Sequence, residues 1–255
     1  MIYMNTTGQM NQEMLVRQSQ VGDSNWWIAV RKSLFQRTFN EMKISQPMRA
    51  LEIGPGAGSN LEIFEDLGIS DVHIADVDYT ALEMCKTYGT TSGVLLDASA
   101  LPYSDESFDL ILVGDVLEHV PNHEQAAREI VRVLKTGGRA IVTVPAFGVL
   151  WSEHDEQAGH QRRYRLHEFK KLFSELEIKI ERCHYFNWVL FLPTLITKKI
   201  MNMVRPTTYV DATSVPSHLN SLLKSIFAFD VRVSKTLHPP FGISIIVVLD
   251  KPIIK

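Results

Sequence analysis

The sequence predicts an α/β domain in which helices cover both faces of a largely parallel sheet. Short apolar runs alternate with amphipathic helical patterns along most of the chain, and the connections between them are short. The first of these runs leads directly into a glycine-rich turn. The composition, with 45% hydrophobic and 22% charged residues, is typical of a soluble globular protein.

Two segments precede the first predicted strand. Residues 1–21 are polar and rich in Met and Gln, which indicates an arm or a lid helix. Residues 25–42 carry apolar side chains at three- and four-residue spacing, which predicts an amphipathic helix. The pattern then predicts strands over 49–53, 72–77, 94–96, 108–113, 140–144, 178–184 and 242–249. Helices are predicted between them over 60–67, 80–88, 124–134 and 166–176.

A long insertion separates the last two predicted strands. Residues 186–238 exceed what a hairpin loop needs, and they hold an apolar stretch interrupted by Pro193 and a second helical pattern over 219–229. We therefore expect a helical cap that covers the substrate. The apolar stretch is too short to span a bilayer, and contact with a membrane surface is the less favoured alternative. The predicted organisation is an arm with a lid helix (1–44), a core (45–185), the cap (186–238) and the last core strand (239–255).

The charge is distributed unevenly along the chain. The net charge is only −3, yet carboxylates dominate residues 1–159 and basic side chains dominate residues 160–255. This pattern favours an anionic small molecule over nucleic acid as the partner, and mutual neutralisation of the two parts explains it equally well. The two cysteines, Cys85 and Cys183, form no metal-ligand or disulfide pattern, and the N-terminus lacks a secretion signal. We therefore expect a cytoplasmic protein.

A glycine-rich turn follows the first strand. The strand over 49–53 runs straight into a Gly-x-Gly-x-Gly sequence that contains Gly54 and Gly56. Glycine lets the backbone turn sharply and approach a ligand closely, and in an open α/β sheet ligands bind at the carboxyl ends of the strands. Glu52 would repel a phosphate but suits a cationic amino group. A nicotinamide or flavin dinucleotide is therefore disfavoured.

Two more acidic positions follow the next strands. Asp78 follows the second strand, where a carboxylate can accept hydrogen bonds from both ribose hydroxyls, and Asp76 is an open alternative for this role. Asp97 and Ala98 follow the third strand, where Asp97 can accept a hydrogen bond from an adenine amine. Together they predict a site for an adenosine with a positively charged tail.

The order and spacing of these motifs resemble the class I S-adenosylmethionine (SAM)-dependent methyltransferases, and most closely their small-molecule branch, which includes quinone-biosynthesis enzymes. The resemblance covers roughly residues 45–180 and rests on residues 51–58, Asp78, Asp97-Ala98, 101–109, 115–119 and 134–138. It implies a Rossmann-like, seven-stranded mixed sheet whose last strand is antiparallel. It also implies SAM as the cofactor and S-adenosylhomocysteine as the product.

The resemblance further assigns roles to individual residues. It implies that Glu52, Gly54 and Gly56 line the methionine side of the cofactor. It places the ribose at Asp78 and the adenine at Asp97 and Ala98, and it implies that Asp115 and Val116 close the pocket. Thr136 departs from the proline that the family usually has before the glycine pair, at a turn far from the site. For Glu118 and His119, capping of a helix and catalysis both remain open.

A dense polar cluster follows the fifth strand and is the predicted acceptor site. His154 and His160 are the candidate general bases, with Asp155 able to orient one of them. Arg162 and Arg163 could hold a carboxylate or phosphate of the substrate. The remaining expected substrate contacts are aromatic: Trp26, Trp27, Trp151 and Tyr164.

Three alternatives to this interpretation stay open. The cluster could be a hydrogen-bonded structural knot, and Trp26 and Trp27 could belong to the core. A metal site formed by His154, Asp155 and His160 is the least favoured alternative, so no metal is expected.

The expected reaction is methyl transfer from SAM to an oxygen of a small, anionic molecule. Methylation at nitrogen or carbon of a small molecule or lipid precursor is the second hypothesis. A SAM-binding partner subunit without transferase activity is a third.

Overall fold

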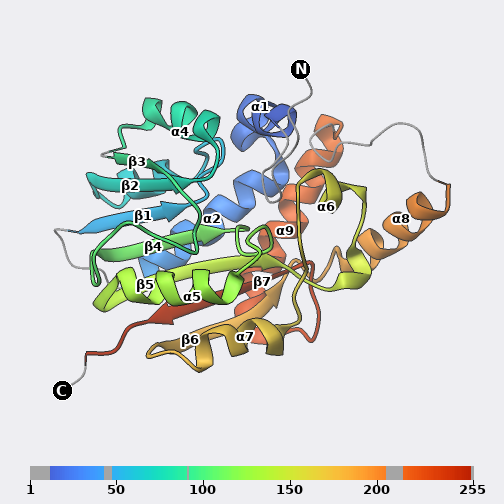
Figure 1. Cartoon of the computed structure of the whole chain (residues 1–255). Helices are drawn as coiled ribbons and strands as arrows, with labels where there is room; N and C mark the ends of the chain where they lie inside the picture. Colours follow the sequence, from blue (N-terminus) through green and yellow to red (C-terminus); the bar gives the residue numbers. More distant parts are fainter. Residues whose placement is uncertain (1–11, 43–47, 91, 205–214, 254–255) are drawn as a thin grey trace.

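The computed structural model describes residues 12–42, 48–90, 92–204 and 215–253 (Figure 1). The first eleven residues of the predicted arm and residues 205–214 of the predicted cap lie outside the described residues. Within the described ranges, no helix combines the length and apolar character needed to cross a bilayer.

A seven-stranded sheet forms the centre of the molecule. Its strands lie in the order β3-β2-β1-β4-β5-β7-β6. Neighbours from β3 to β5 pair in parallel, and β7 is antiparallel to both β5 and β6, as expected for the last strand. The bounds are β1 (Arg49–Ile53), β2 (Asp71–Asp76), β3 (Ser92–Leu95), β4 (Phe108–Gly114), β5 (Leu134–Pro145), β6 (Lys179–Phe186) and β7 (Ser244–Asp250).

Helices connect the strands and cover both faces of the sheet (Figure 1). Asn25 caps α2 by accepting hydrogen bonds from the backbone N–H groups of Trp27 and Ile28, which begins the helix where the apolar pattern begins. The α-helices are α1 (Gln12–Val21), α2 (Trp26–Glu41), α3 (Glu62–Asp66), α4 (Tyr79–Cys85), α5 (His123–Val133), α6 (Glu153–Gln157), α7 (Leu166–Ser174), α8 (Phe191–Val204) and α9 (Ser217–Leu237). Short 3-10 turns are η1 (Gly22–Ser24), η2 (Lys86–Tyr88) and η3 (Gly148–Leu150).

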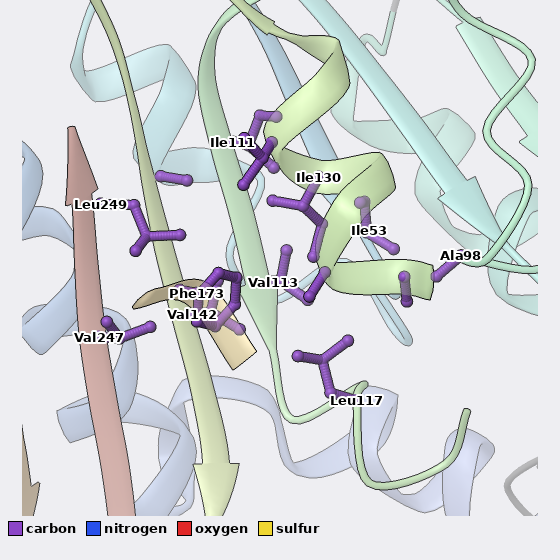
Figure 2. Close-up of a cluster of buried hydrophobic side chains, with 14 of the residues drawn as sticks. Ile53, Ala98, Ile111, Val113, Leu117, Ile130, Val142, Phe173, Val247 and Leu249 are labelled. Atoms are coloured by element: carbon purple, nitrogen blue, oxygen red, sulfur yellow. The ribbon is translucent and has the colours of Figure 1, made fainter. Parts of the chain in front are cut away.

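Two hydrophobic layers hold the helices on the sheet. On one face, Ile130 of α5 and Phe173 of α7 pack over side chains of the central strands, among them Val113 and Val142 (Figure 2). On the other face, α2, α3 and α9 pack their apolar sides against the sheet. The sheet is therefore buried on both sides, and the central strands β1, β4 and β7 are largely apolar.

The strand order determines where a ligand-binding crevice can form. Strand β1 pairs with β2 on one side and with β4 on the other, so the chain changes direction across the sheet at β1. In open α/β sheets such a switch point opens a crevice at the carboxyl ends of the strands. The glycine-rich turn after β1 lies at this edge.

The second half of the predicted cap is instead a helix of the sheet layer. Phe227 and Val231 of α9 are buried against the sheet, and Asp230 accepts hydrogen bonds from the backbone N–H groups of Asn187 and Val189. The amphipathic pattern of this segment is therefore satisfied by the sheet and α2. Helix α8 reaches the turn after β5, where Lys198 donates to the carbonyl of Leu150, and its role as a cap stays a prediction.

Candidate cofactor and acceptor site

A cavity lies at the carboxyl ends of the first four strands. Its wall combines the turn after β1, the ends of β2 and β3, and the segment after β4, and Leu15 of α1 also lines it. Helix α1 thus lies beside the glycine turn, and its role as a lid stays a prediction. Sequence reasoning gave no signal for Leu15 in particular.

The turn after β1 needs glycine for two reasons. Gly54 has φ +68°, a left-handed conformation that favours glycine, and a Cβ atom there would lie 2.3 Å from Cγ2 of Val116. The backbone of the turn therefore lies directly against the segment after β4. Gly54, Gly56 and Val116 all line the cavity, and their contact with the cofactor stays a prediction.

Asp76 and Asp78 both line the cavity but differ in their surroundings. Asp78 caps α4, because its Oδ1 accepts a hydrogen bond from the Thr80 N–H at 2.7 Å. Asp76 ends β2, accepts hydrogen bonds from the backbone N–H groups of Asp78 (2.9 Å) and Gly56, and has a pKa raised by burial to about 6. One carboxylate oxygen of Asp78 thus caps helix α4, whereas Asp76 lies deeper in the wall of the cavity.

The two residues predicted to contact the adenine also lie in the cavity wall. Asp97 and Ala98 line it just beyond β3, and Ala98 is buried. Oδ1 of Asp97 accepts a hydrogen bond from the backbone N–H of Ser99 at 2.7 Å, which orients the carboxylate.

Asp115 forms an ion pair with an arginine of a helix that is distant in the sequence. It has φ +58°, and its Oδ2 lies 2.6 Å from Nη1 of Arg31 in α2, while its Oδ1 accepts from the Thr143 hydroxyl at 3.2 Å. The sequence did not single out Arg31 as a site residue. Its position in the helix that starts with the tryptophan pair, one turn after Trp27, is the signal that was available.

Glu52 lies behind the wall and is not among the residues that line the cavity. It is fully buried, and its Oε1 accepts a hydrogen bond from Nδ2 of Asn60 at 2.8 Å. Its Oε2 has no partner among the described residues, and burial raises its pKa to about 7. Contact of Glu52 with the methionine moiety therefore stays a prediction.

The cavity fits an adenosine with a cationic tail better than a dinucleotide. Four carboxylates line it, those of Asp76, Asp78, Asp97 and Asp115, and none of the described lining residues is a lysine or an arginine. A pyrophosphate in such a wall would be repelled. The glycine turn leaves space for the ligand to approach the backbone, so the residues present fit SAM.

The predicted acceptor cluster is organised around Asp155. This fully buried side chain accepts hydrogen bonds from Nδ1 of His160 (2.9 Å) and Nε of Arg163 (2.7 Å). Burial opposes its charge, but His160 and Arg163 together hold the pKa of Asp155 well below its usual range. His154 lies further out, with its ring centroid 6.4 Å from that of His160, and burial lowers its pKa to about 4.

Most of the side chains predicted to contact the substrate instead form contacts within the protein. Arg162 donates to the backbone carbonyls of Leu117, Val120 and Pro121, and Arg163 also donates to the carbonyl of Ala146. None of the predicted substrate residues is among those lining the cavity: Trp26, Trp27, Trp151, Arg162, Arg163 and Tyr164.

The aromatic members of this set have structural contacts. Tyr164 is buried and donates to the Leu117 carbonyl at 3.0 Å. Trp26 and Trp27 pack on Phe227 of α9. The alternative of a structural knot and a core role for the tryptophans agrees with these contacts.

Residues 51–142 match the family model described as a methyltransferase domain. Among curated proteins, the chain is 30% identical over 123 residues to the methyltransferase GfsG of Streptomyces halstedii, covering 45% of this chain and 44% of that protein. It is 34% identical over 113 residues to a ubiquinone biosynthesis O-methyltransferase of Chelativorans sp., covering 42% and 44%. It is 29% identical over 124 residues to the C-methyltransferase UbiE of Vibrio vulnificus, covering 44% and 48%. The matched region spans less than half the length of each of these relatives.

Solved structures share the fold over most of the chain. A chain from the complex between the Haloferax volcanii methyltransferase activator Trm112 and a methyltransferase has a TM-score of 0.63 at 17% sequence identity, covering 98% of this chain and 99% of that one. At this identity the likeness shows the fold alone. The matched domain, the ordered motifs and the carboxylate-lined cavity agree: residues 51–142 form a methyltransferase domain, and the chain is similar to class I SAM-dependent methyltransferases of the small-molecule type, whose cofactor is SAM.

Proposed function

We propose that the protein transfers the methyl group of SAM to an oxygen atom of a small molecule. The single observation that carries the proposal is the position of His119. This residue lines the cofactor cavity and lies beside Glu118 and His160, so that two imidazoles and one carboxyl group meet where an acceptor would approach the cofactor. An oxygen acceptor must lose a proton as it reacts, and basic groups at this place serve that need.

SAM supplies an electrophilic methyl group on a sulfonium, and the protein has to align the acceptor with it and exclude water. We propose that Asp76, which ends β2 deeper in the cavity wall, holds the ribose hydroxyls, and that Asp78 serves mainly to cap α4. Asp97 with Ala98 would contact the adenine. The closely packed Gly54 and Val116 would fix the methionine end.

The charge of the acceptor is a separate question. The anionic substrate expected from the sequence depended on Arg162 and Arg163, and both guanidinium groups are used by hydrogen bonds inside the protein. Their contacts therefore give no support for an anionic acceptor.

The test uses SAM labelled with carbon-13 in the methyl group. The protein is incubated with this cofactor and a panel of phenols, catechols and hydroxy acids, while release of S-adenosylhomocysteine is followed. We expect a product whose labelled carbon has the chemical shift of an O-methyl group. A product methylated only at carbon or nitrogen would favour the second hypothesis, which the name of the UbiE relative supports.

A binding role without transfer is the remaining rival. One structural neighbour, the methyltransferase of Haloferax volcanii, is in a complex with the activator Trm112, and this observation supports considering the rival. Calorimetric binding of S-adenosylhomocysteine together with no methylated product from any acceptor would favour this rival over the proposed reaction.

A further inference from the structure

Three potential metal ligands from two distant segments meet beside the cofactor cavity. Glu118 and His119 follow β4, and His160 follows α6. One ligand atom from each lies within 4.8 Å of the other two, and Oε1 of Glu118 lies 4.0 Å from Nε2 of His160. The rings of His119 and His160 lie 4.7 Å apart between centroids and are nearly perpendicular.

Glu118 lacks the partner that a buried carboxylate needs. It is fully buried, and apart from its own backbone N–H, no group in the described part of the chain reaches either of its oxygens in hydrogen-bond geometry. Buried carboxylates are normally paired with a cation or hydrogen-bonded, because an isolated one is costly. A cation bound at Glu118 would satisfy both oxygens.

Neighbouring arginines do not supply that cation. Arg31 lies 2.6 Å from Asp115, and Arg163 lies 2.7 Å from Asp155, so each arginine already neutralises its own carboxylate. Glu118 is left as the carboxylate without a bound cation in this cluster. The local charge balance therefore favours a positive ligand.

Both histidines present a ring nitrogen to Glu118. Nδ1 of His160 is held by Asp155 at 2.9 Å, which leaves Nε2 toward Glu118. The His119 ring interacts with the backbone carbonyls of Ala158 and Gly159, while its Nδ1 has no hydrogen-bond partner within the described ranges. We therefore assign the proton of His119 to Nε2. A histidine whose second nitrogen donates to a carboxylate or a carbonyl is the usual arrangement at metal sites.

We propose that Glu118, His119 and His160 bind a divalent transition-metal ion at the wall of the cofactor cavity. Two imidazoles and one carboxylate suit zinc, iron, cobalt or nickel better than magnesium or calcium. Metal–ligand bonds of about 2.0–2.1 Å place tetrahedral ligands about 3.4 Å apart, so the three side chains would close by roughly 1 Å. Small rotations about side-chain bonds achieve this.

Only three protein ligands take part, which leaves coordination positions open on the cavity side, where His119 lies. With the ion bound, the three ligands would no longer act as bases: an acceptor oxygen that reaches the open positions would have its pKa lowered by the ion and would lose its proton to solvent. The role of the ion in methyl transfer rests on the proposed function. The ion site itself stands on the geometry of the three ligands.

The ligand set differs from the alternative that the sequence raised, namely His154, Asp155 and His160. Asp155 already accepts hydrogen bonds from His160 and Arg163 and from the backbone of Ser152. In our proposal Asp155 orients His160 from behind.

Metal binding is tested on the purified protein after removal of bound metal with a chelator. Calorimetric titration with zinc chloride and visible absorption with cobalt chloride give stoichiometry, affinity and a ligand-field spectrum. We expect one equivalent of each ion and cobalt bands of a site with nitrogen and oxygen ligands. Failure of the wild type to bind either ion stoichiometrically would overturn the proposal.

Matched variants distinguish this site from adventitious binding by surface histidines. His119→Ala, His160→Ala and Glu118→Gln should each weaken zinc binding by at least about tenfold. His167→Ala, which removes an exposed histidine, should leave it unchanged. Equal losses in His160→Ala and His167→Ala would mean an adventitious ion only and would overturn the proposal.

Binding of S-adenosylhomocysteine to His160→Ala serves as the control for folding. Retained binding with lost zinc affinity supports the ion site. If the variants do not fold, the stoichiometry and cobalt spectrum of the wild type decide. If the wild type binds zinc but methylates no acceptor, the ion site stands and the proposed function fails.

Discussion

Asp76 and Asp78 are two residues apart, and the backbone N–H of Asp78 donates to Oδ1 of Asp76 at 2.9 Å. The carboxylate of Asp78 in turn accepts from the Thr80 N–H at 2.7 Å and caps α4. The two carboxylates therefore have separate structural tasks at one edge of the cavity. The ribose site at Asp76 is our proposal, and Asp78 is the residue that the sequence favoured.

The first prediction compares Asp76→Asn with Asp78→Asn in calorimetric titrations with S-adenosylhomocysteine. Asn caps a helix about as well as Asp, so Asp78→Asn should keep the cofactor affinity within roughly twofold. Asp76→Asn removes a carboxylate that we assign to the ribose hydroxyls, and it should weaken binding at least about tenfold, or 1.4 kcal/mol. The reverse order of the two variants would give the ribose to Asp78.

This pair also shows how far sequence reasoning reaches. The apolar pattern of β2 places both carboxylates at the strand end, because parallel strands end at a common edge. It does not tell them apart, since the distinction depends on which backbone N–H groups each side chain accepts from. Those contacts form only when the turn folds.

The second prediction concerns the contact between the glycine turn and the segment after β4. A methyl group at Gly54 would lie 2.3 Å from Cγ2 of Val116, and φ is +68°. Gly54→Ala should therefore destabilise the fold by about 2 kcal/mol from crowding and backbone strain together. Val116→Ala in the same chain should restore roughly half, because it relieves the crowding but not the strain.

Urea unfolding of the two single variants and the double variant measures these effects. A double variant whose stability equals the sum of the single effects would show that Val116 is not the group that excludes a side chain at Gly54.

The third prediction is a pH dependence of stability caused by Glu52. Burial raises the pKa of Glu52 from the ordinary 4.5 to about 7. Between these values the folded protein keeps a proton that the unfolded chain has released, so stability falls as pH rises from 4.5 to about 7 and is level above. The Glu52→Gln variant has no carboxyl group to titrate at this position, so it does not lose this stability as the pH rises. Its stability relative to the wild type should therefore rise by about 3 kcal/mol from acid to alkaline pH.

Urea unfolding of both proteins at pH 5 and pH 8 measures the difference, with the exposed Glu65→Gln as control. A stability difference that is the same at both pH values would contradict the raised pKa of Glu52.

Contacts between segments far apart in the chain set the limit of sequence reasoning for the fold. The strands and the alternating helices follow from local patterns, and the predicted seven-stranded mixed sheet is confirmed. The pattern of α9 predicts an apolar face but not its partner, and the structure ties this helix to α2 through Asn220, whose Oδ1 accepts from the Trp26 N–H at 2.9 Å. The pairing of Arg31 with Asp115 is similarly non-local. No spacing in the sequence encodes either contact.

The last prediction separates a structural from a substrate-binding role for Arg162. Its guanidinium donates to the carbonyls of Leu117, Val120 and Pro121, which orders the segment that carries Glu118 and His119. Hydrogen bonds from a charged donor contribute more than neutral ones, so Arg162→Ala should lower the free energy of unfolding by about 2 kcal/mol. Arg162→Lys keeps the charge but not the planar fork that reaches several carbonyls, and it should recover only part of the loss.

Urea unfolding of both variants measures this effect, and the surface variant Arg128→Ala is the control. If the stability of Arg162→Ala equals that of the wild type, the segment does not depend on this side chain. The guanidinium would then be available to an anionic acceptor, as the sequence suggested. A loss of stability, with Lys between Ala and Arg, would instead make Arg162 the support on which the histidine and glutamate cluster is held.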